Sequence, residues 1–275
     1  DRALHAAQRA FETWRKSSPL QRSKVLRRVA ELTRERAPQI ARQITLDQGK
    51  PLGEALLEVT TCAEHADWHA EECRRIYGRI IPARLPHVRQ LVLREPVGVC
   101  VAFTPWNFPF NQAIRKMVAA IGAGCTLVLK GPEDSPGAVI ALARMFHEAG
   151  LPAGVLNVVW GVPSEVSDHL IRSPISRKVS FTGSVPTGIA VGQSAMGAGL
   201  TRATLELGGK NSAGFLRDVD LDKAVNGIIE AGFLHSGQIC AAAERFFVHR
   251  SQIEAVMGKL AQRLSALNIG SPLDE

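Results

Sequence analysis

The chain has 275 residues, of which 45% are hydrophobic and 21% charged, and its formal net charge is +7. This composition is typical of a globular protein, and no apolar run is long enough to cross a bilayer, which excludes an integral membrane protein. The basic residues are spread among apolar helical positions, and a single tyrosine offers little base stacking, so we interpret the charge as a solvated surface and expect no nucleic-acid partner.

The cysteines and the first residues bear on the cellular compartment and on the extent of the chain. The five cysteines form an odd set without regular spacing, which predicts reduced thiols in the cytoplasm. The sequence opens inside a helical pattern, with neither an initiator methionine nor the apolar stretch of a signal peptide, so we expect that it has been trimmed. The cysteines are Cys62, Cys73, Cys100, Cys125 and Cys240.

Residues 1–78 carry apolar side chains at helical spacing, which predicts a group of N-terminal helices. The stretch CAEHADWHAEEC admits a second interpretation, a metal site formed by Cys62, His65, His69 and Cys73. One helix would hold the two cysteines about 16 Å apart, which is too far for a single ion. We therefore expect no metal, and predict a packing stripe with Cys62 and both histidines at its border. The stripe consists of Ala63, Ala66, Ala70 and Cys73.

Residues 79–97 read as two extended stretches around a proline-containing turn, and their prolines exclude a central strand. We expect an edge hairpin that contacts a surface outside this part of the chain. Residues 98–206 alternate short β-rich runs with helical segments, which predicts an α/β fold with a Rossmann-like parallel sheet and helices on both faces. The runs are VCVAF, TLVLK, VLNVV, KVSFT and ATLEL. Such sheets bind ligands at the carboxyl ends of their strands.

Chemically useful side chains follow several of these strands. Asn107 lies in the irregular loop TPWNFPF, where it either serves a site or stabilises its own turn. Lys130 and Glu133 follow the second run and suit a phosphate or a ribose, but equally a surface ion pair. Glu206, in LELGGK, has apolar neighbours. Burial there would raise its pKa toward that of a general base, the alternative being a carboxylate that caps a backbone amide.

Two further stretches carry candidate site residues. FTGSVPTG places Ser184 between Gly183 and Gly188 at the start of a helix, which suits a pyrophosphate but also a plain strand-to-helix turn. Cys240 ends the stretch GFLHSGQIC, behind glycines and a polar pair at the end of a predicted helix, where packing alone would favour apolar residues.

Taken in order, the stretches PWNFP, LKxxE, FTGSxxxG, LELGGK and GQxC resemble the motifs of the aldehyde dehydrogenase superfamily, and the resemblance covers the whole chain. It implies that Cys240 is the nucleophile that attacks an aldehyde, with the Asn107 amide and the backbone N–H of Cys240 stabilising the oxyanion. It further implies that Glu206 activates the water that hydrolyses a thioester, and that Lys116 relays protons. The implied product is a carboxylic acid.

The same resemblance implies a dinucleotide cofactor. Lys130 and Glu133 resemble the pair that holds the adenosine ribose, and the Glu133 carboxylate repels a 2′-phosphate, which favours NAD over NADP. Gly131-Pro132 stands where the family more often has proline first. The residues implied to bind the cofactor are Thr104, Trp106, Lys130, Glu133, Gly161, Gly183, Ser184, Gly188 and Leu207.

Residues 78–130 are most similar to the succinate-semialdehyde dehydrogenase branch of the family. Arg115 matches an arginine that this branch uses for the distal carboxylate, whereas Leu234 stands in place of a second arginine. We expect the substrate to be a semialdehyde or a more apolar aldehyde.

The resemblance also implies the domain organisation. Residues 1–78 would form N-terminal helices of the cofactor domain, 79–97 a bridging or oligomerisation hairpin, 98–206 the NAD-binding domain and 207–275 the first part of an incomplete catalytic domain. The family's N-terminal strands and the rest of its catalytic domain are missing. We expect part of a longer chain that forms a homodimer or homotetramer, or else a truncated, non-catalytic fragment.

Overall fold

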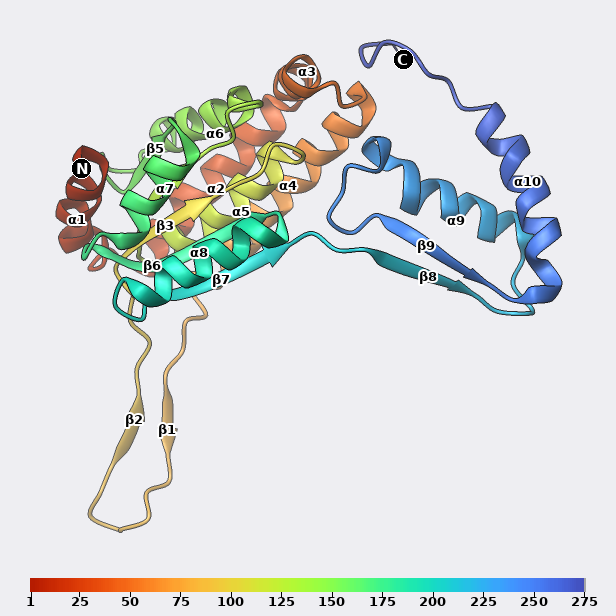
Figure 1. Ribbon diagram of the computed structural model, residues 1–275. Helices are drawn as coiled ribbons and strands as arrows, with labels where there is room; N and C mark the ends of the chain where they lie inside the picture. The colour runs from red at the N-terminus through yellow and green to blue at the C-terminus, as the bar shows by residue number, and fades with distance from the viewer. Residues whose placement is uncertain (275) are drawn as a thin grey trace.

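A five-stranded parallel sheet lies at the centre of the computed structural model, which describes residues 1–274 (Figure 1). The strands lie in the order β5-β4-β3-β6-β7, and every neighbouring pair runs parallel. The central strand, β3, is buried along its whole length. The predicted parallel sheet is therefore confirmed. Its strands are β3 (Val99–Phe103), β4 (Thr126–Lys130), β5 (Leu156–Val159), β6 (Ser176–Gly183) and β7 (Arg202–Leu207).

Helices cover both faces of this sheet. Alternate residues of β3 point to opposite sides, and all of them are apolar and buried. Cys100 and Ala102 pack against one helical layer, whereas Val99, Val101 and Phe103 pack against the other. The first layer contains α2 (Pro19–Glu35), α3 (Ala37–Gln48), α4 (Leu52–Glu72), α5 (Pro109–Gly122) and α6 (Pro136–Glu148). The second contains α1 (Arg2–Trp14), α7 (Pro163–Arg172) and α8 (Val185–Gly197).

Helix α4 carries the predicted packing stripe. Its alanines and Cys73 are buried, as expected from their spacing. The prediction that Cys62 lies at the border of the stripe is wrong, since Cys62 is fully buried in the same core. Burial raises the pKa of the Cys62 thiol, which keeps it protonated and suits a packing role.

The hairpin predicted for residues 79–97 projects away from the sheet as a separate antiparallel ribbon (Figure 1). It pairs β1 (Arg79–Ile81) with β2 (Gln90–Val92) and forms no edge of the central sheet. Several of its apolar side chains are exposed, Ile80 by 81% and Leu93 by 76%. The ribbon therefore presents apolar surface far from the core.

A smaller lobe follows β7 and lies beside the N-terminal turns of α4 and α5 (Figure 1). Its two strands are parallel and pack on two helices through Val225, Ile228 and Val256. The lobe contains β8 (Asn211–Phe215), α9 (Leu221–Phe233), η1 (Leu234–Gly237), β9 (Ala243–Val248), η2 (Arg250–Gln252) and α10 (Ile253–Ser265). None of the helices in residues 1–274 has the length and apolarity needed to span a bilayer.

Candidate active site

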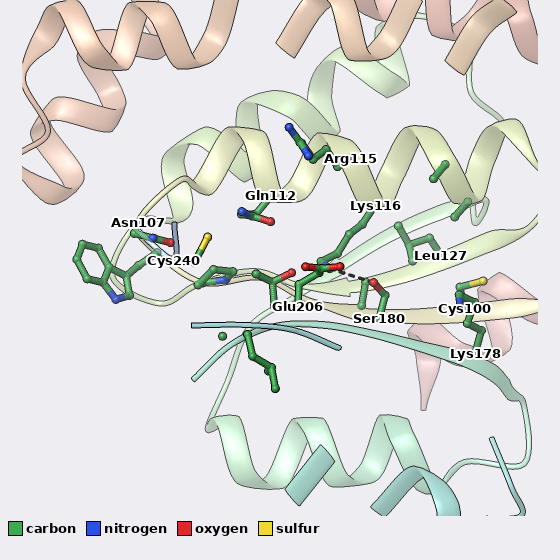
Figure 2. Close-up of a pocket in the computed structure, with 18 of the residues that line it drawn as sticks. Cys100, Asn107, Gln112, Arg115, Lys116, Leu127, Lys178, Ser180, Glu206 and Cys240 are labelled. Carbon is green, nitrogen blue, oxygen red and sulfur yellow. Dashed lines mark hydrogen bonds between the residues drawn. The ribbon is translucent and has the colours of Figure 1, made fainter. Parts of the chain in front are cut away.

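A cavity of about 950 Å³ lies between α5 and the strands β3, β6 and β7 (Figure 2). Figure 2 shows Asn107 and Cys240 at one end, Glu206 and Lys116 along its length, and Cys100 at the other end. The structure thus brings together the four residues predicted to be catalytic, which come from the loop before α5, from α5, from β7 and from the turn after α9. The meeting follows from topology, because the carboxyl ends of parallel strands share one edge of the sheet.

Cys240 follows a sharp turn that ends α9. His235, Ser236 and Gly237 have φ values of 49°, 56° and 77°, the left-handed region that non-glycine residues rarely occupy. The Cys240 side chain is exposed, and its carbonyl accepts a hydrogen bond of 2.8 Å from Asn211 Nδ2. Within residues 1–274, the backbone N–H of Cys240 donates to no acceptor. The turn therefore presents both the thiol and this N–H without internal partners.

Asn107 lies in the loop between β3 and α5. Its side-chain Nδ2 donates to the carbonyl of Gln238 at 2.8 Å, which joins this loop to the segment that carries Cys240. An asparagine amide has two N–H groups, so one donor remains for another acceptor. The backbone carbonyl of Asn107 accepts from Lys50 Nζ at 2.8 Å and from Gln48 Nε2 at 3.4 Å.

Glu206 and Lys116 line the middle of the cavity. The prediction that apolar neighbours desolvate Glu206 is wrong for the described residues, because its side chain is exposed in the half-covered strand β7. Lys116 is largely enclosed, and its Nζ donates to Ser180 Oγ at 2.9 Å. Burial lowers the pKa of Lys116 to about 8, although the charge of Glu206 acts in the opposite direction. Lys116 can therefore exchange a proton at mildly alkaline pH.

His235 anchors the turn before Cys240. Its ring is buried and makes edge contacts with Trp106 and Phe108, at centroid distances of 6.0 and 5.6 Å. Burial, assisted by the charge of Lys50, lowers the pKa of His235 to about 4. The ring is therefore neutral at neutral pH and behaves as part of the packing around Trp106.

The residues predicted to bind pyrophosphate form a narrow strand-to-helix turn. Ser184 caps α8 through the backbone N–H of Thr187. A Cβ placed on Gly188 would lie 2.4 Å from Leu207 Cδ2, so a larger residue in this turn would displace the Leu207 side chain. Thr104 and Thr182 are buried, and their Oγ1 atoms have no hydrogen-bond partner in the described part of the chain. A glycine cradle, a helix N-terminus and two unpartnered hydroxyls fit a dinucleotide.

Lys130 and Glu133 form an ion pair at the end of β4. Lys130 is buried, whereas the Glu133 side chain is 41% exposed. The loop between them packs on Trp160, whose Nε1 donates to the carbonyl of Pro132 at 3.1 Å. With Gly131-Pro132 between them, Lys130 and Glu133 remain paired. Gly161, at φ 141°, follows Trp160 in the next strand-to-helix loop.

The two residues predicted to contact the substrate lie on different elements. Arg115 lines the cavity from α5, and its NH2 lies 3.0 Å from Nε2 of His65 on α4. Burial, followed by the charge of Arg115, lowers the pKa of His65, which favours a neutral ring that accepts this hydrogen bond. Leu234 lies in η1 and is 40% exposed, but it is not among the residues that line the cavity.

Several residues that support the site were not predicted from the sequence. Lys50 and Glu58 form a fully buried ion pair beneath the Asn107 loop, and Asn211 holds the carbonyl of Cys240. Gln112 lines the cavity one helical turn before Lys116. A signal for Glu58 was present in the sequence, because its spacing from Ala55 places a carboxylate in an apolar helical stripe.

The sequence profile of the aldehyde dehydrogenase family matches residues 1–275. The chain belongs to this family. Glutarate-semialdehyde dehydrogenase of Pseudomonas putida is 42% identical over 274 residues, which are 100% of this chain and 57% of that protein. The NADP(+) succinate-semialdehyde dehydrogenase of Escherichia coli is 41% identical, over 99% of this chain and 56% of that protein.

Solved aldehyde dehydrogenase structures have the same fold. An NAD-dependent aldehyde dehydrogenase from Sinorhizobium meliloti superimposes with a TM-score of 0.96 at 38% identity, covering 99% of this chain and 55% of that one. The chain therefore spans just over half the length of the relatives it matches.

The lowered pKa of Lys116 predicts a specific dependence of stability on pH. Its pKa falls from 10.5 to about 8 on folding, so between these values the unfolded chain binds more protons. We expect this contribution to the free energy of unfolding to rise from pH 8 to 10.5, and Lys116→Met to remove the rise. Urea unfolding at several pH values tests this against Lys24→Met, which alters an exposed lysine. Parallel pH curves for wild type and Lys116→Met would contradict it.

Proposed function

We propose that the protein containing this chain oxidises an aldehyde to the carboxylic acid with NAD(P). One observation carries the proposal: Cys240, Asn107, Glu206 and Lys116 line a single cavity. Family membership supports the same reaction, and the strand-to-helix cradle beside this cavity supports the cofactor.

In the first half of the reaction, Cys240 forms the bond to substrate. Its thiolate attacks the aldehyde carbon, and the electron pair of the C=O bond moves onto oxygen. The free N–H of Cys240 and the second N–H of the Asn107 amide are the donors for this oxyanion. A bound nicotinamide would accept the hydride that the carbon then loses, which leaves a thioester on Cys240.

In the second half, Glu206 takes a proton from water, whose oxygen adds to the thioester carbon. The C–S bond breaks and returns the thiolate. One aldehyde, one oxidised cofactor and one water thus give one carboxylate, one reduced cofactor and two protons. The exposure of Glu206 supports access of its carboxylate to water, and Lys116 with Ser180 offers a route for the proton.

We propose NAD as the preferred cofactor. Support comes from the Lys130–Glu133 pair, which offers a carboxylate for ribose hydroxyls and disfavours a 2′-phosphate. The relatives named above include one NADP(+) enzyme and one NAD-dependent enzyme, so the choice rests on Glu133 itself.

For the substrate we propose a semialdehyde or a related aldehyde with a distal anionic group. Arg115 supports this, because its guanidinium lines the cavity on the same helix as Lys116. Leu234 offers no second cation, which favours weaker binding of a distal carboxylate than two arginines would give.

The remaining proposals concern the whole protein. The exposed apolar side chains of the β1–β2 ribbon support a bridging role in a homodimer or homotetramer. The free thiols of all five cysteines support a reducing compartment, and we propose the cytoplasm.

The assignment of the nucleophile is tested in the full-length protein. Cys240→Ala should abolish aldehyde oxidation and retain cofactor binding, because it removes only the group that bonds to substrate. Cys125→Ala is the matched control and should remain active. A hydrogen bond from Cys100 lowers the pKa of the Cys125 thiol to about 6, so this control removes a thiol that is itself readily ionised. Aldehyde oxidation that survives in Cys240→Ala would show that Cys240 is not the nucleophile.

A second variant separates the general base from the nucleophile. Glu206→Gln should leave the rapid first release of reduced cofactor intact and slow the steady rate by about 10²-fold or more, since only the activation of water is lost. Stopped-flow absorbance at 340 nm separates the two phases. An equal loss in both phases would mean that Glu206 acts before the thioester forms.

Cofactor preference depends on one charge. Glu133→Gln should raise the use of NADP relative to NAD by about tenfold, which corresponds to about 1.4 kcal/mol. The measurement is the ratio of kcat/KM for the two cofactors at saturating aldehyde. Glu165→Gln, an exposed carboxylate on α7, serves as the control. An unchanged ratio in Glu133→Gln would remove the support for NAD.

A further inference from the structure

The segment before and within the first turns of α4 contacts both parts of the candidate oxyanion site. Lys50, Glu54 and Glu58 are spaced four residues apart. Lys50 lies just before α4, and the two glutamates lie in its first turns. Lys50 and Glu58 contact the Asn107 loop, whereas Glu54 contacts the turn that carries Cys240. None of the three has a role in the reaction proposed above.

Lys50 and Glu58 hold the Asn107 loop from both sides. The Lys50 ammonium donates to the carbonyl of Asn107 at 2.8 Å and lies 3.5 Å from the centre of the Phe108 ring. Glu58 Oε1 accepts from the backbone N–H groups of Phe110 and Asn111 at 3.1 and 3.0 Å. These are orphan donors at the start of α5, whose N-cap residue makes no side-chain cap. Glu58 therefore caps α5 from another helix.

The energetics indicate that the pair fixes a position and is not a general stabiliser. Both side chains are fully buried, and burial lowers the pKa of Lys50 and raises that of Glu58, while each charge opposes the other's shift. Burying two charges costs several kcal/mol, and apolar residues of the same size are often as stable. What an apolar pair cannot supply is the donor to the Asn107 carbonyl and the acceptor for the α5 amides.

Glu54 extends this arrangement to the nucleophile. Its Oε2 accepts from the backbone N–H of His235 at 2.8 Å, at the start of the left-handed turn. The Asn107 amide then donates to Gln238, two residues before Cys240. One helix start thus contacts the Asn107 loop and the Cys240 turn independently of their direct contact.

We propose that Lys50 and Glu58 are positioning residues that hold the Asn107 amide at the oxyanion site, and that Glu54 holds the Cys240 turn in register with it. This inference rests on the proposed function. A displacement of about 1 Å in such a site costs about 10²-fold in rate. The predicted defect is in bond formation at the aldehyde carbon and not in cofactor binding.

The test is a mutant cycle in the full-length enzyme. Lys50→Met combined with Glu58→Gln removes both charges together and keeps an oxygen for the α5 amides, so no lone buried charge remains. We expect kcat for aldehyde oxidation to fall at least tenfold, with unchanged affinity for NAD by fluorescence titration. In an Asn107→Ala background, the same two substitutions should lower kcat less than twofold further, because the group that they position is gone.

Two additional variants complete the test: one examines Glu54, and the other is a control for stability. Glu54→Ala removes a half-buried acceptor without breaking the buried pair, and we expect the same loss of kcat and the same non-additivity with Asn107→Ala. Arg34→Met with Asp67→Asn breaks an exposed ion pair between α2 and α4, away from the Asn107 loop, and should leave kcat unchanged. Hydrogen exchange of the peptide 105–112 reports the position of the loop without reference to activity. It should accelerate only in the variant that combines Lys50→Met with Glu58→Gln.

The outcomes separate the two proposals. A wild-type enzyme without aldehyde oxidation would overturn the proposed function. If the wild type is active, but the Lys50 and Glu58 substitutions lower kcat by the same factor with and without Asn107, only the positioning role is overturned. Unchanged kcat in a folded Glu54→Ala variant would overturn the part assigned to Glu54.

Discussion

The hydrogen bond from Asn107 to the carbonyl of Gln238 joins the two parts of the molecule at the place where chemistry is proposed. Its donor belongs to the loop after the central strand, and its acceptor lies 131 residues later, before Cys240. This amide connects the sheet to the smaller lobe, alongside the contact between Glu54 and His235, and keeps a second N–H for the substrate. Any shift of the lobe against the sheet would move the thiol and the oxyanion donor apart.

The sheet and the cysteine site could be predicted because their signals are local. Each strand is a short run of β-branched and apolar residues, and a strand buried on both faces needs no partner to be recognised. Parallel topology then brings the ends of these runs to one edge, so Asn107 and Glu206 meet there, while Lys116 reaches the same cavity from helix α5. The order of the strands and the separate ribbon of residues 79–97 depend on distant pairing, which local patterns do not encode.

Burial of individual side chains was harder to predict. Glu206 has apolar neighbours along the chain, but alternate residues of a strand face opposite sides, and its own side is open in the described residues. Cys62 lies deeper than its helical stripe suggested, because α5 packs on this side of α4 and brings Asn111 and Arg115 close to the thiol. The contacts of Lys50 and Glu58 with the Asn107 loop depend on how α4 packs against the start of α5, which the sequence pattern does not show. The left-handed turn at His235 had no glycine signal at its first two positions.

The contact between Gly131 and Trp160 bears on how this loop can change during evolution or design. A Cβ on residue 131 would lie 3.0 Å from the Trp160 ring, so a larger residue there requires the indole to move by a few tenths of an ångström. Moving the indole would also disturb its hydrogen bond to the carbonyl of Pro132. Positions 131 and 160 are therefore coupled, and a loop grafted from a relative should be transferred together with its partner at 160.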